Sequence, residues 1–297
     1  MLWLRYLTEA TQSEAPWPQR SGKTPVSAGR LTRAFSLYPS NQRDAWQAIM
    51  SYEYRLNFGI EWAPPIDAGT LGVLDFVEEV TRLVPVLTHL ETGQEEGVFS
   101  LCQTENGERV REVRVERTGI DCTAVSGLPP REQISFIRQV AMGAQKLQIP
   151  KIMLRYVDLR YIFWIAHWGN HHELVASAFW QSGPLGTLRS AIEGPLAIAT
   201  TNFTLALAGH EDLCLQVEIA PQTGMHEIET GRYDGDSLGI LFAIARTGGF
   251  GRASTFPEIV GELEAIWESK VEEAARASVL QPILDLARGS ESASREP

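Results

Sequence analysis

Three histidines that lie close together are the residues with the clearest potential for metal or acid–base chemistry. His167, His171 and His172 fall within one short segment, and Asp158 lies nine residues before the first of them. Residues four apart share a face of a helix, so His167 and His171 could place two imidazoles on one divalent metal. The pattern defines one hypothesis, a metal-dependent enzyme whose ligands are His167, His171, His172 and Asp158.

The same segment also has a structural interpretation. Gly169 and Asn170 separate His167 from the other two histidines and are typical of a turn, in which Asn170 would cap a helix that begins at His171. The zinc-protease motif H-E-x-x-H is not completed, because Ala176 stands where the second histidine is required. In this interpretation the histidines are capping or surface residues.

Two other motifs are incomplete. Gly235-Asp236-Ser237-Leu238-Gly239 fits the G-x-S-x-G pattern of a nucleophile elbow, but the last histidine of the chain, His226, precedes the serine. A hydrolase of that kind needs a downstream histidine as its base. Ser21-Gly22-Lys23-Thr24 ends like a phosphate-binding loop, but Trp17 replaces the first glycine and Pro25 follows. The sequence therefore predicts no cofactor.

One arginine and several aromatic side chains occupy the segment that leads to the histidines. At strand spacing such aromatic residues favour a buried core or a subunit or partner interface, and a small-molecule pocket is the third alternative. An arginine buried in a strand needs an ionic partner. Asp158 is not the obvious partner of Arg155, because residues three apart lie on opposite faces of a regular strand. The group comprises Arg155, Tyr156, Tyr161, Trp164 and Trp168.

The composition is that of a globular cytoplasmic protein. The chain has 297 residues, of which 44% are hydrophobic, and its formal net charge is −11, which repels nucleic-acid phosphates. Its three widely spaced cysteines fit small buried side chains in a reducing compartment. The N-terminus lacks the apolar run of a secretory signal, and residues 194–209, the longest uncharged segment, are shorter than the roughly 20 residues of a membrane span.

Hydrophobic periodicity predicts three helices and seven strands. The clearest helix begins near Phe256 behind a capping box of Thr255 and Glu258, and Pro282 is expected to kink or end it. The other helices cover residues 67–83, with Leu71, Leu74, Val77 and Val80 inward, and residues 130–148. The strands are predicted at 54–62, 97–103, 110–117, 120–125, 152–166, 204–207 and 213–219.

The order of these elements indicates the fold class. Several strands follow one another between helices, so we expect an α+β protein with mainly antiparallel sheets and a long C-terminal helix. Two sheet-and-helix units, 57–150 and 151–288, are expected to meet where Pro150 ends one helix. Residues 1–56 are predicted to be an N-terminal extension with a linker, and residues 289–297 a disordered tail.

The segment Leu154-Arg155-Tyr156-Val157-Asp158 resembles a motif of an uncharacterised, sporadically distributed family of bacterial proteins. In that family Leu-Arg-Tyr is followed by an aliphatic residue, by Asn or Asp, and then by Arg and Ile; Leu159 departs from this pattern. The similarity extends to Trp62-Ala63-Pro64-Pro65 and to a final helix, and covers roughly residues 57 to 288. The resemblance implies a bacterial cytoplasmic protein of an accessory system, such as antiviral defence, and it transfers no catalytic residue.

Two functional hypotheses remain from the sequence. The leading one is a non-catalytic binding or assembly subunit that recognises a protein or peptide partner, or a second copy of itself, because aromatic residues are abundant and no catalytic motif is complete. The alternative is the metal-dependent enzyme described above. Neither hypothesis involves direct binding to nucleic acid or to a membrane.

Overall fold

A computed structural model gives the structure of the chain. It describes residues 52–65, 72–92, 98–105, 107–124, 128–167, 169–181, 183–192, 199, 201–233, 237–250 and 255–293. The linker expected within residues 1–56, apart from the start of the first strand, lies outside the described residues, as do Trp168 and Gly235.

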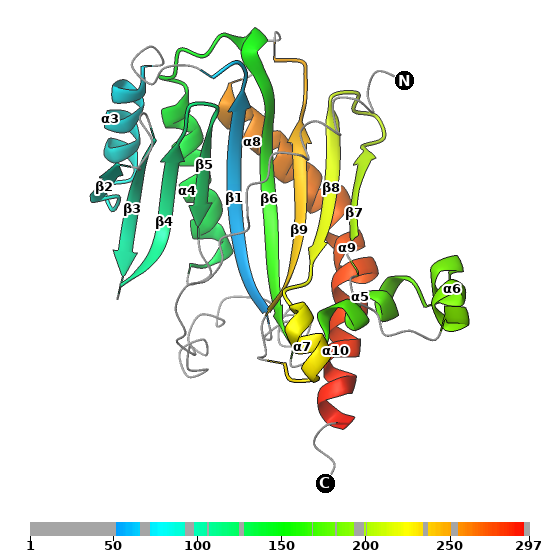
Figure 1. Ribbon diagram of the computed structural model, residues 1–297. Coiled ribbons are helices and arrows are strands. Elements are labelled where there is room, and N and C mark those ends of the chain that lie inside the picture. The colour runs from blue at the N-terminus through cyan, green and yellow to red at the C-terminus, as the bar shows by residue number, and fades with distance from the viewer. Residues whose placement is uncertain are drawn as a thin grey trace, which may run out of the picture. The chain divides into compact units, whose positions relative to one another are not determined.

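Nine strands of the described residues form one antiparallel sheet, so the predicted α+β class is confirmed. The strand order is β2-β3-β4-β5-β1-β6-β9-β8-β7, and each neighbouring pair is antiparallel (Figure 1). The strands are β1 (Tyr52–Trp62), β2 (His89–Thr92), β3 (Phe99–Glu105), β4 (Glu108–Val115), β5 (Gly119–Ala124), β6 (Leu154–Ala166), β7 (Thr201–Ala206), β8 (Leu213–Ala220) and β9 (Ser237–Arg246).

The helices connect these strands and complete the chain. Three short elements carry the label η: one 3₁₀ turn and two π-helical segments. The helical elements are α3 (Val73–Leu83), α4 (Pro130–Ala144), η3 (Lys151–Met153), α5 (His171–Phe179), α6 (Pro184–Ile192), α7 (Met225–Thr230), α8 (Phe256–Ile266), η4 (Trp267–Val271), α9 (Glu272–Ala275), η5 (Arg276–Leu280) and α10 (Gln281–Ala293).

The two expected sheets are halves of one continuous sheet. β1 belongs to the first predicted unit and β6 to the second. The two strands pair along the whole length of β1, so the two units share one sheet. The halves repeat one another around this junction: β5, β4 and β3 follow β1 on one side, and β9, β8 and β7 follow β6 on the other. The first half alone adds a further edge strand, β2, beside β3.

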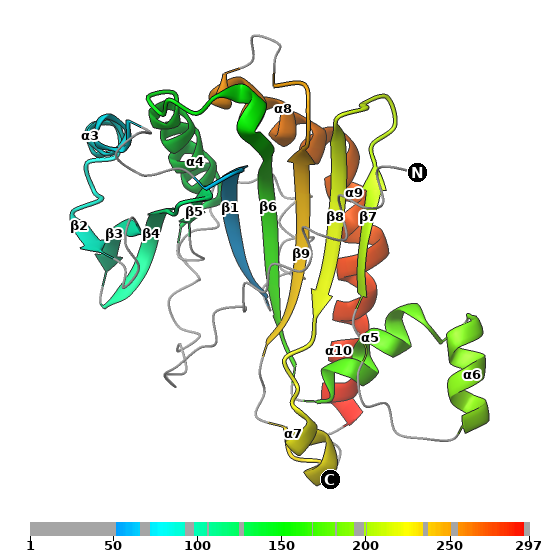
Figure 2. The ribbon, with the colours of Figure 1, turned by 45° about the horizontal axis from the view of Figure 1, so that its top comes forward.

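The helices that pack against the strands lie on one face of the sheet. α4 contacts β1 and β5, while α8 contacts β6 and β9, and both helices lie behind the sheet in Figures 1 and 2. Alternate residues of the central strands point toward them, including Phe58 and Trp62 of β1 and Leu159 of β6, and all of these are buried. This side of the sheet therefore forms the hydrophobic core.

The C-terminal helix differs from the prediction at Pro282. The chain continues in helical conformation from Phe256 to Ala293, with the π-helical segment η5 immediately before the proline. A proline clashes with the carbonyl group four residues earlier in a regular α-helix, and a wider π turn at that point relieves the clash. The helix also extends into residues 289–297, which were predicted to form a disordered tail.

Side-chain direction in α3 also differs from the prediction. Its buried residues are Val73, Phe76 and Val80, whereas Leu74 is 84% exposed. Apolar residues lie along two adjacent rows of this helix. The row that contains Phe76 packs inward, and the row that contains Leu74 does not. Leu71 lies outside the described residues.

Several local predictions are confirmed. Thr255 and Glu258 form the expected capping box at the start of α8. The Asn170 side chain accepts hydrogen bonds from the backbone N–H groups of His172 and Glu173, and α5 begins at His171 as predicted. The strands β2 and β9 were not among the seven predicted.

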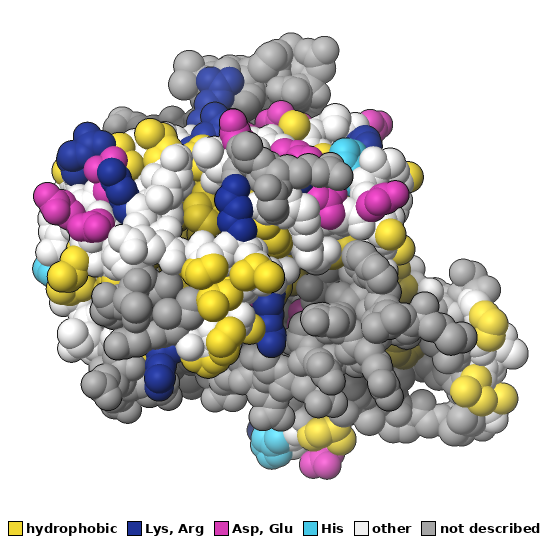
Figure 3. Space-filling view, turned by 90° about the horizontal axis from the view of Figure 1, so that it is seen from above, with side chains coloured by type: hydrophobic (Ala, Val, Ile, Leu, Met, Phe, Trp, Pro, Cys, Tyr) yellow, Lys and Arg dark blue, Asp and Glu magenta, His cyan; other side chains and the backbone are white. Residues whose placement is uncertain are grey.

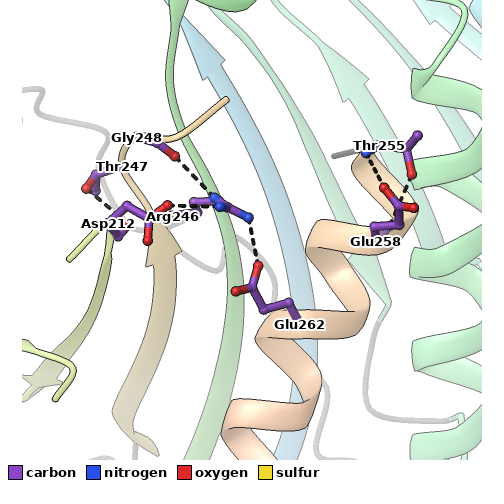
Figure 4. A network of polar contacts seen from close by, with 7 residues as sticks. All are labelled: Asp212, Arg246, Thr247, Gly248, Thr255, Glu258 and Glu262. Carbon is purple, nitrogen blue, oxygen red and sulfur yellow. Dashed lines mark hydrogen bonds and ion pairs between the residues drawn. The ribbon is translucent and has the colours of Figure 1, made fainter. Parts of the chain in front are cut away.

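A buried arginine fixes the end of β9 to α8 (Figure 4). The Arg246 guanidinium donates to Asp212 at 2.9 Å, to Glu262 of α8 at 2.7 Å and to the carbonyl group of Gly248 at 3.1 Å. Only 9% of the Arg246 side chain is exposed, so these acceptors compensate for its desolvation. Gly249, which follows, has a φ of 73°, a conformation that glycine adopts without strain.

Two helical glycines provide a test of the packing between α3 and α4. A Cβ atom on Gly143 of α4 would overlap Val80 of α3, whereas a Cβ atom on Gly261 of α8 would meet nothing within 4 Å. We expect Gly143→Ala to reduce the free energy of unfolding by about 1–3 kcal/mol through overpacking. Gly261→Ala should instead raise it by up to about 1 kcal/mol, because alanine favours the helix. Urea unfolding followed by circular dichroism measures both, and equal effects would contradict this packing.

Candidate functional site

The second face of the sheet is polar. Side chains alternate along a strand, so those that do not enter the core point toward this second face. The central strands place both charged and aromatic side chains on it. We call this surface the polar face. Its residues are Arg55, Asn57 and Glu61 of β1, Asp121 and Thr123 of β5, Tyr156, Asp158, Arg160 and Trp164 of β6, and Gln216 and Glu218 of β8.

A cluster of three charged residues lies at the centre of the polar face. The Arg160 guanidinium donates to Asp158 at 2.7 Å through Nε and to Asp121 at 3.0 Å through Nη1. Asp158 is on the same strand as Arg160, but Asp121 is on β5, on the far side of β1. The arginine therefore bridges three adjacent strands. We call Asp121, Asp158 and Arg160 the central charge cluster.

Gly59 of β1 makes this bridge sterically feasible. It is paired with Asp121 on one side and with Asp158 on the other, so it lies directly between the two carboxylates. A Cβ atom at this position would lie 2.6 Å from Arg160 Nη2 and would overlap Asp158 as well. The missing side chain leaves the space that the guanidinium occupies.

The electrostatic balance of the cluster keeps Arg160 charged. Burial lowers the pKa of Arg160, but the negative charges of Asp158 and Asp121 outweigh this effect and raise it above its ordinary value. Asp158 is the more deeply buried carboxylate, with 8% of its side chain exposed, against 41% for Asp121. One guanidinium faces two carboxylates, so the cluster as a whole has a negative charge.

Two aromatic residues flank the cluster along β6. Burial, the negative charge of Asp158 and a hydrogen bond to Glu61 raise the pKa of Tyr156 above its ordinary value, so its hydroxyl remains protonated. Trp164, toward the other end of the strand, is half-buried and packs over Gly239 of β9. The Arg55 guanidinium lies over the Trp164 ring, 5.9 Å from its centroid, which is within the range of a cation–π contact.

The structure separates the residues that the sequence grouped with these aromatics. Arg155 is 56% exposed and pairs with Glu61 at 3.4 Å, so it is not the buried arginine that the sequence suggested. Tyr161 belongs to the core, where it stacks on Trp267 with ring centroids 3.7 Å apart. Trp168 lies outside the described residues.

The ring nitrogens of His172 are engaged in structural hydrogen bonds. Nδ1 accepts the backbone N–H of Ala199 at 2.9 Å, and Nε2 lies 3.1 Å from the carbonyl oxygen of Thr223. Nδ1 also lies 3.2 Å from the carbonyl oxygen of Ala199, so both ring nitrogens are occupied by backbone groups. His172 thereby connects α5 to two segments distant in sequence.

The ring nitrogens of His171 also contact backbone groups. Its Nδ1 accepts the backbone N–H of Gln222 at 3.2 Å, and its Nε2 lies 3.3 Å from the carbonyl oxygen of His167. The backbone N–H of His171 also donates to the Thr223 hydroxyl at 3.0 Å. All three histidines are buried, so the expectation of surface histidines is wrong, while Asn170 is the residue that caps the helix.

The predicted four-residue metal site is not formed. Asp158 lies within β6 and His167 directly follows that strand, and about 3.3 Å of rise per residue separates them by roughly 30 Å. The ring nitrogens of His171 and His172 are directed at backbone groups. Within the described ranges, no three His, Cys, Asp or Glu side chains form a group that could hold a metal ion.

The three cysteines are buried, as the sequence predicted. Burial raises the pKa of Cys102, Cys122 and Cys214, so the thiolate that reacts with disulfide reagents is scarce. We expect negligible labelling of the native chain by Ellman's reagent at about pH 8 and complete labelling of all three thiols in urea. Rapid reaction of any thiol in the native chain would contradict its placement.

An exposed apolar group adjoins one end of the polar face. Ile152, just before β6, is 94% exposed, and Pro64 and Pro65 after β1 are exposed too. Figure 3 views the molecule from this end and shows hydrophobic side chains gathered near the middle, with Lys and Arg side chains around them. Exposed apolar groups rimmed by charges are typical of interaction surfaces.

The central charge cluster was not predicted from the sequence. Asp158 and Arg160 are two apart and therefore share a face of a strand, which is a signal that the sequence contains. Asp121 is separated from Arg160 by 39 residues, and only the strand order brings them together.

In comparisons with known proteins, no family model and no curated protein matches this chain. None of the helices in the described part of the chain combines the length and hydropathy needed to cross a bilayer.

Proposed function

We propose that this protein is a non-catalytic binding subunit that recognises a partner protein or peptide through its polar face. The observation that carries the proposal is the central charge cluster, a fixed set of charges on the middle strands of a broad sheet. Arg160 holds both carboxylates in place, and half-buried Tyr156 and Trp164 flank them. Rigid aromatic and arginine side chains are enriched among residues that dominate binding energy at interfaces.

The charge of this face favours a basic partner. On β1, β5, β6 and β8 its carboxylates, on Glu61, Asp121, Asp158 and Glu218, outnumber the guanidinium groups of Arg55 and Arg160, and β4 adds one charge of each sign, Glu112 and Arg114. The chain as a whole has a formal net charge of −11, so its long-range field attracts cationic surfaces. Lysine or arginine side chains of a partner could approach Asp121, which is the more exposed carboxylate of the cluster.

We propose a bacterial accessory system, such as antiviral defence, as the setting, on the family resemblance of the sequence alone. The rival hypothesis of a metal-dependent enzyme has less support from the geometry. Asp158 lies within β6, far from the histidines, and ring nitrogens of His171 and His172 already contact backbone groups.

Affinity purification from the native host tests the proposal. Wild-type protein with a non-histidine tag is compared with Asp121→Asn/Trp164→Ala, which removes the more exposed carboxylate of the cluster and a flanking aromatic side chain, and with Leu74→Ser on α3, an exposed control. We expect a basic partner in stoichiometric amount with the wild type and the control, eluted by salt, and its loss with the double variant. Equal recovery with the double variant, or no stoichiometric partner with the wild type, would overturn the proposal.

A further inference from the structure

Arg160 binds the two carboxylates of the central charge cluster unequally. Its Nε donates to Asp158 Oδ2 at 2.7 Å, and Asp158 lies two residues away on the same strand. Its Nη1 donates to Asp121 Oδ1 at 3.0 Å, across β1. The Asp158 side chain is 8% exposed and that of Asp121 is 41% exposed. Release of Asp121 therefore costs less than release of Asp158, because water can solvate the more exposed carboxylate.

Asp158 has a second oxygen close to the same guanidinium. Its Oδ1 is buried and has no hydrogen-bond partner in the described part of the chain. Asp158 Oδ1 and Arg160 Nη2 both border the space that Gly59 leaves above β1, because a Cβ atom at this glycine would overlap both atoms. Two nitrogens of one guanidinium form a parallel pair of hydrogen bonds with a single carboxylate. A rotation of Arg160 that brings Nη2 to Oδ1 would complete this pair and withdraw Nη1 from Asp121.

The charged groups that face Asp121 from the neighbouring strands are mainly acidic. They are Glu112, Arg114 and Glu116 of β4, Glu61 of β1, and Asp158 and Arg160 of β6. Arg114 pairs with Glu116 at 2.7 Å, so Arg160 is the cation of this group that binds Asp121. Burial raises the pKa of Asp121, Arg160 lowers it and the nearby carboxylates raise it, with a net upward shift. Asp121 therefore takes up a proton at a higher pH than an ordinary aspartate does.

We propose that the central charge cluster is a two-position switch, in which a proton on Asp121 moves Arg160 from the bridge between the carboxylates to a bidentate pair with Asp158. The proton makes Asp121 a neutral acceptor, and a hydrogen bond between a charged donor and a carboxylate is stronger than one to a neutral acceptor. Asp158 then has the remaining negative charge of the cluster, and its Oδ1 accepts the second bond. Loss of the proton restores the bridge.

The switch makes partner binding depend on pH. In the bridged position Asp121 is negatively charged, and in the other position it is neutral, so the cluster loses its net negative charge. A basic partner is expected to bind more weakly as the pH falls through the pKa of Asp121. This consequence rests on the proposed function, whereas the movement of Arg160 takes place in the free chain.

Nuclear magnetic resonance of the full-length free chain tests the switch. Isotope labels in the arginine side chains and the aspartate carboxyl groups are followed from neutral pH down to about pH 4, near the ordinary pKa of an aspartate. We expect the Asp121 carboxyl signal and the Arg160 Nε and Nη signals to shift with the same midpoint. In Asp121→Asn, which imitates the neutral state, the Arg160 signals should match those of the wild type at low pH throughout.

The matched control is Asp285→Asn on α10, an exposed aspartate that bonds to Gln281, and it should leave the wild-type titration unchanged. Circular dichroism at each pH verifies that both variants are folded. Arg160 signals that stay constant while Asp121 titrates would overturn the switch. An Asp121 that stays ionised down to about pH 4 would overturn it too, as would Arg160 signals in Asp121→Asn that match the wild type at neutral pH.

Failure of the switch is distinguishable from failure of the proposed function. The titration uses the free chain, whereas the proposed function is tested by recovery of a partner. If Arg160 moves with the titration of Asp121 but no partner is recovered, the proposed function fails and the switch stands. If a partner is recovered but Arg160 does not move, the switch alone fails.

Discussion

Replacement of Arg160 with methionine is expected to reduce the free energy of unfolding by about 3 kcal/mol. The substitution leaves the Asp158 carboxylate, which is 8% exposed, without the cation that compensates for its burial. It also removes the connection to Asp121 across β1. Urea unfolding at neutral pH, followed by circular dichroism, measures the loss.

The matched control for this variant is Arg114→Met. Arg114 lies on β4, is 55% exposed and pairs with Glu116 at the surface, so its loss should cost no more than about 1 kcal/mol. Adding Asp158→Asn to Arg160→Met should recover part of the lost stability, because the buried charge is removed as well. If the two arginine variants lose equal stability, or the double variant is the least stable, the central charge cluster does not have the role described.

Replacement of His172 with alanine is the second change with a large expected effect, and we expect it to reduce the free energy of unfolding by about 2–4 kcal/mol. The substitution leaves the buried N–H of Ala199 and the carbonyl group of Thr223 without their partner, and it creates a cavity beside α5. His89→Ala, on the exposed strand β2, is the control and should change stability by less than about 0.5 kcal/mol. Thermal and urea unfolding of both variants measure this difference.

Elemental analysis of protein purified without a histidine tag separates the structural role from the metal hypothesis. The hydrogen bonds of His171 and His172 predict that no zinc or iron co-purifies in stoichiometric amount. Stoichiometric metal that disappears in His167→Ala/His171→Ala would favour the enzyme hypothesis instead.

Features that depend on neighbouring residues were predictable from the sequence. The Asn170 cap and the Thr255–Glu258 capping box involve residues two or three apart, and the hydrogen bonds that define them form as soon as the helix does. The alternation of apolar residues placed most strands to within a few residues. In α3 two apolar rows overlap, and only the packing against α4 selects Phe76 over Leu74.

Features that depend on strand order could not be predicted in the same way. The central charge cluster requires β1 to lie between β5 and β6, and Gly59 acquires its role only in that register. Likewise, the histidines appear as a metal-binding pattern in sequence, but their nitrogens meet backbone groups of Ala199, Gln222 and Thr223, which lie far along the chain.

Site-specific photo-cross-linking in the native host tests the central claim most directly. A benzoylphenylalanine is placed at Thr123 or Gln216 on the polar face, and at Leu74 on α3 as the control position. Recognition through the polar face predicts one discrete cross-linked product, containing the same basic partner, from both face positions and none from position 74. Products from position 74 alone, or none from either face position, would contradict the claim that this face is the binding surface.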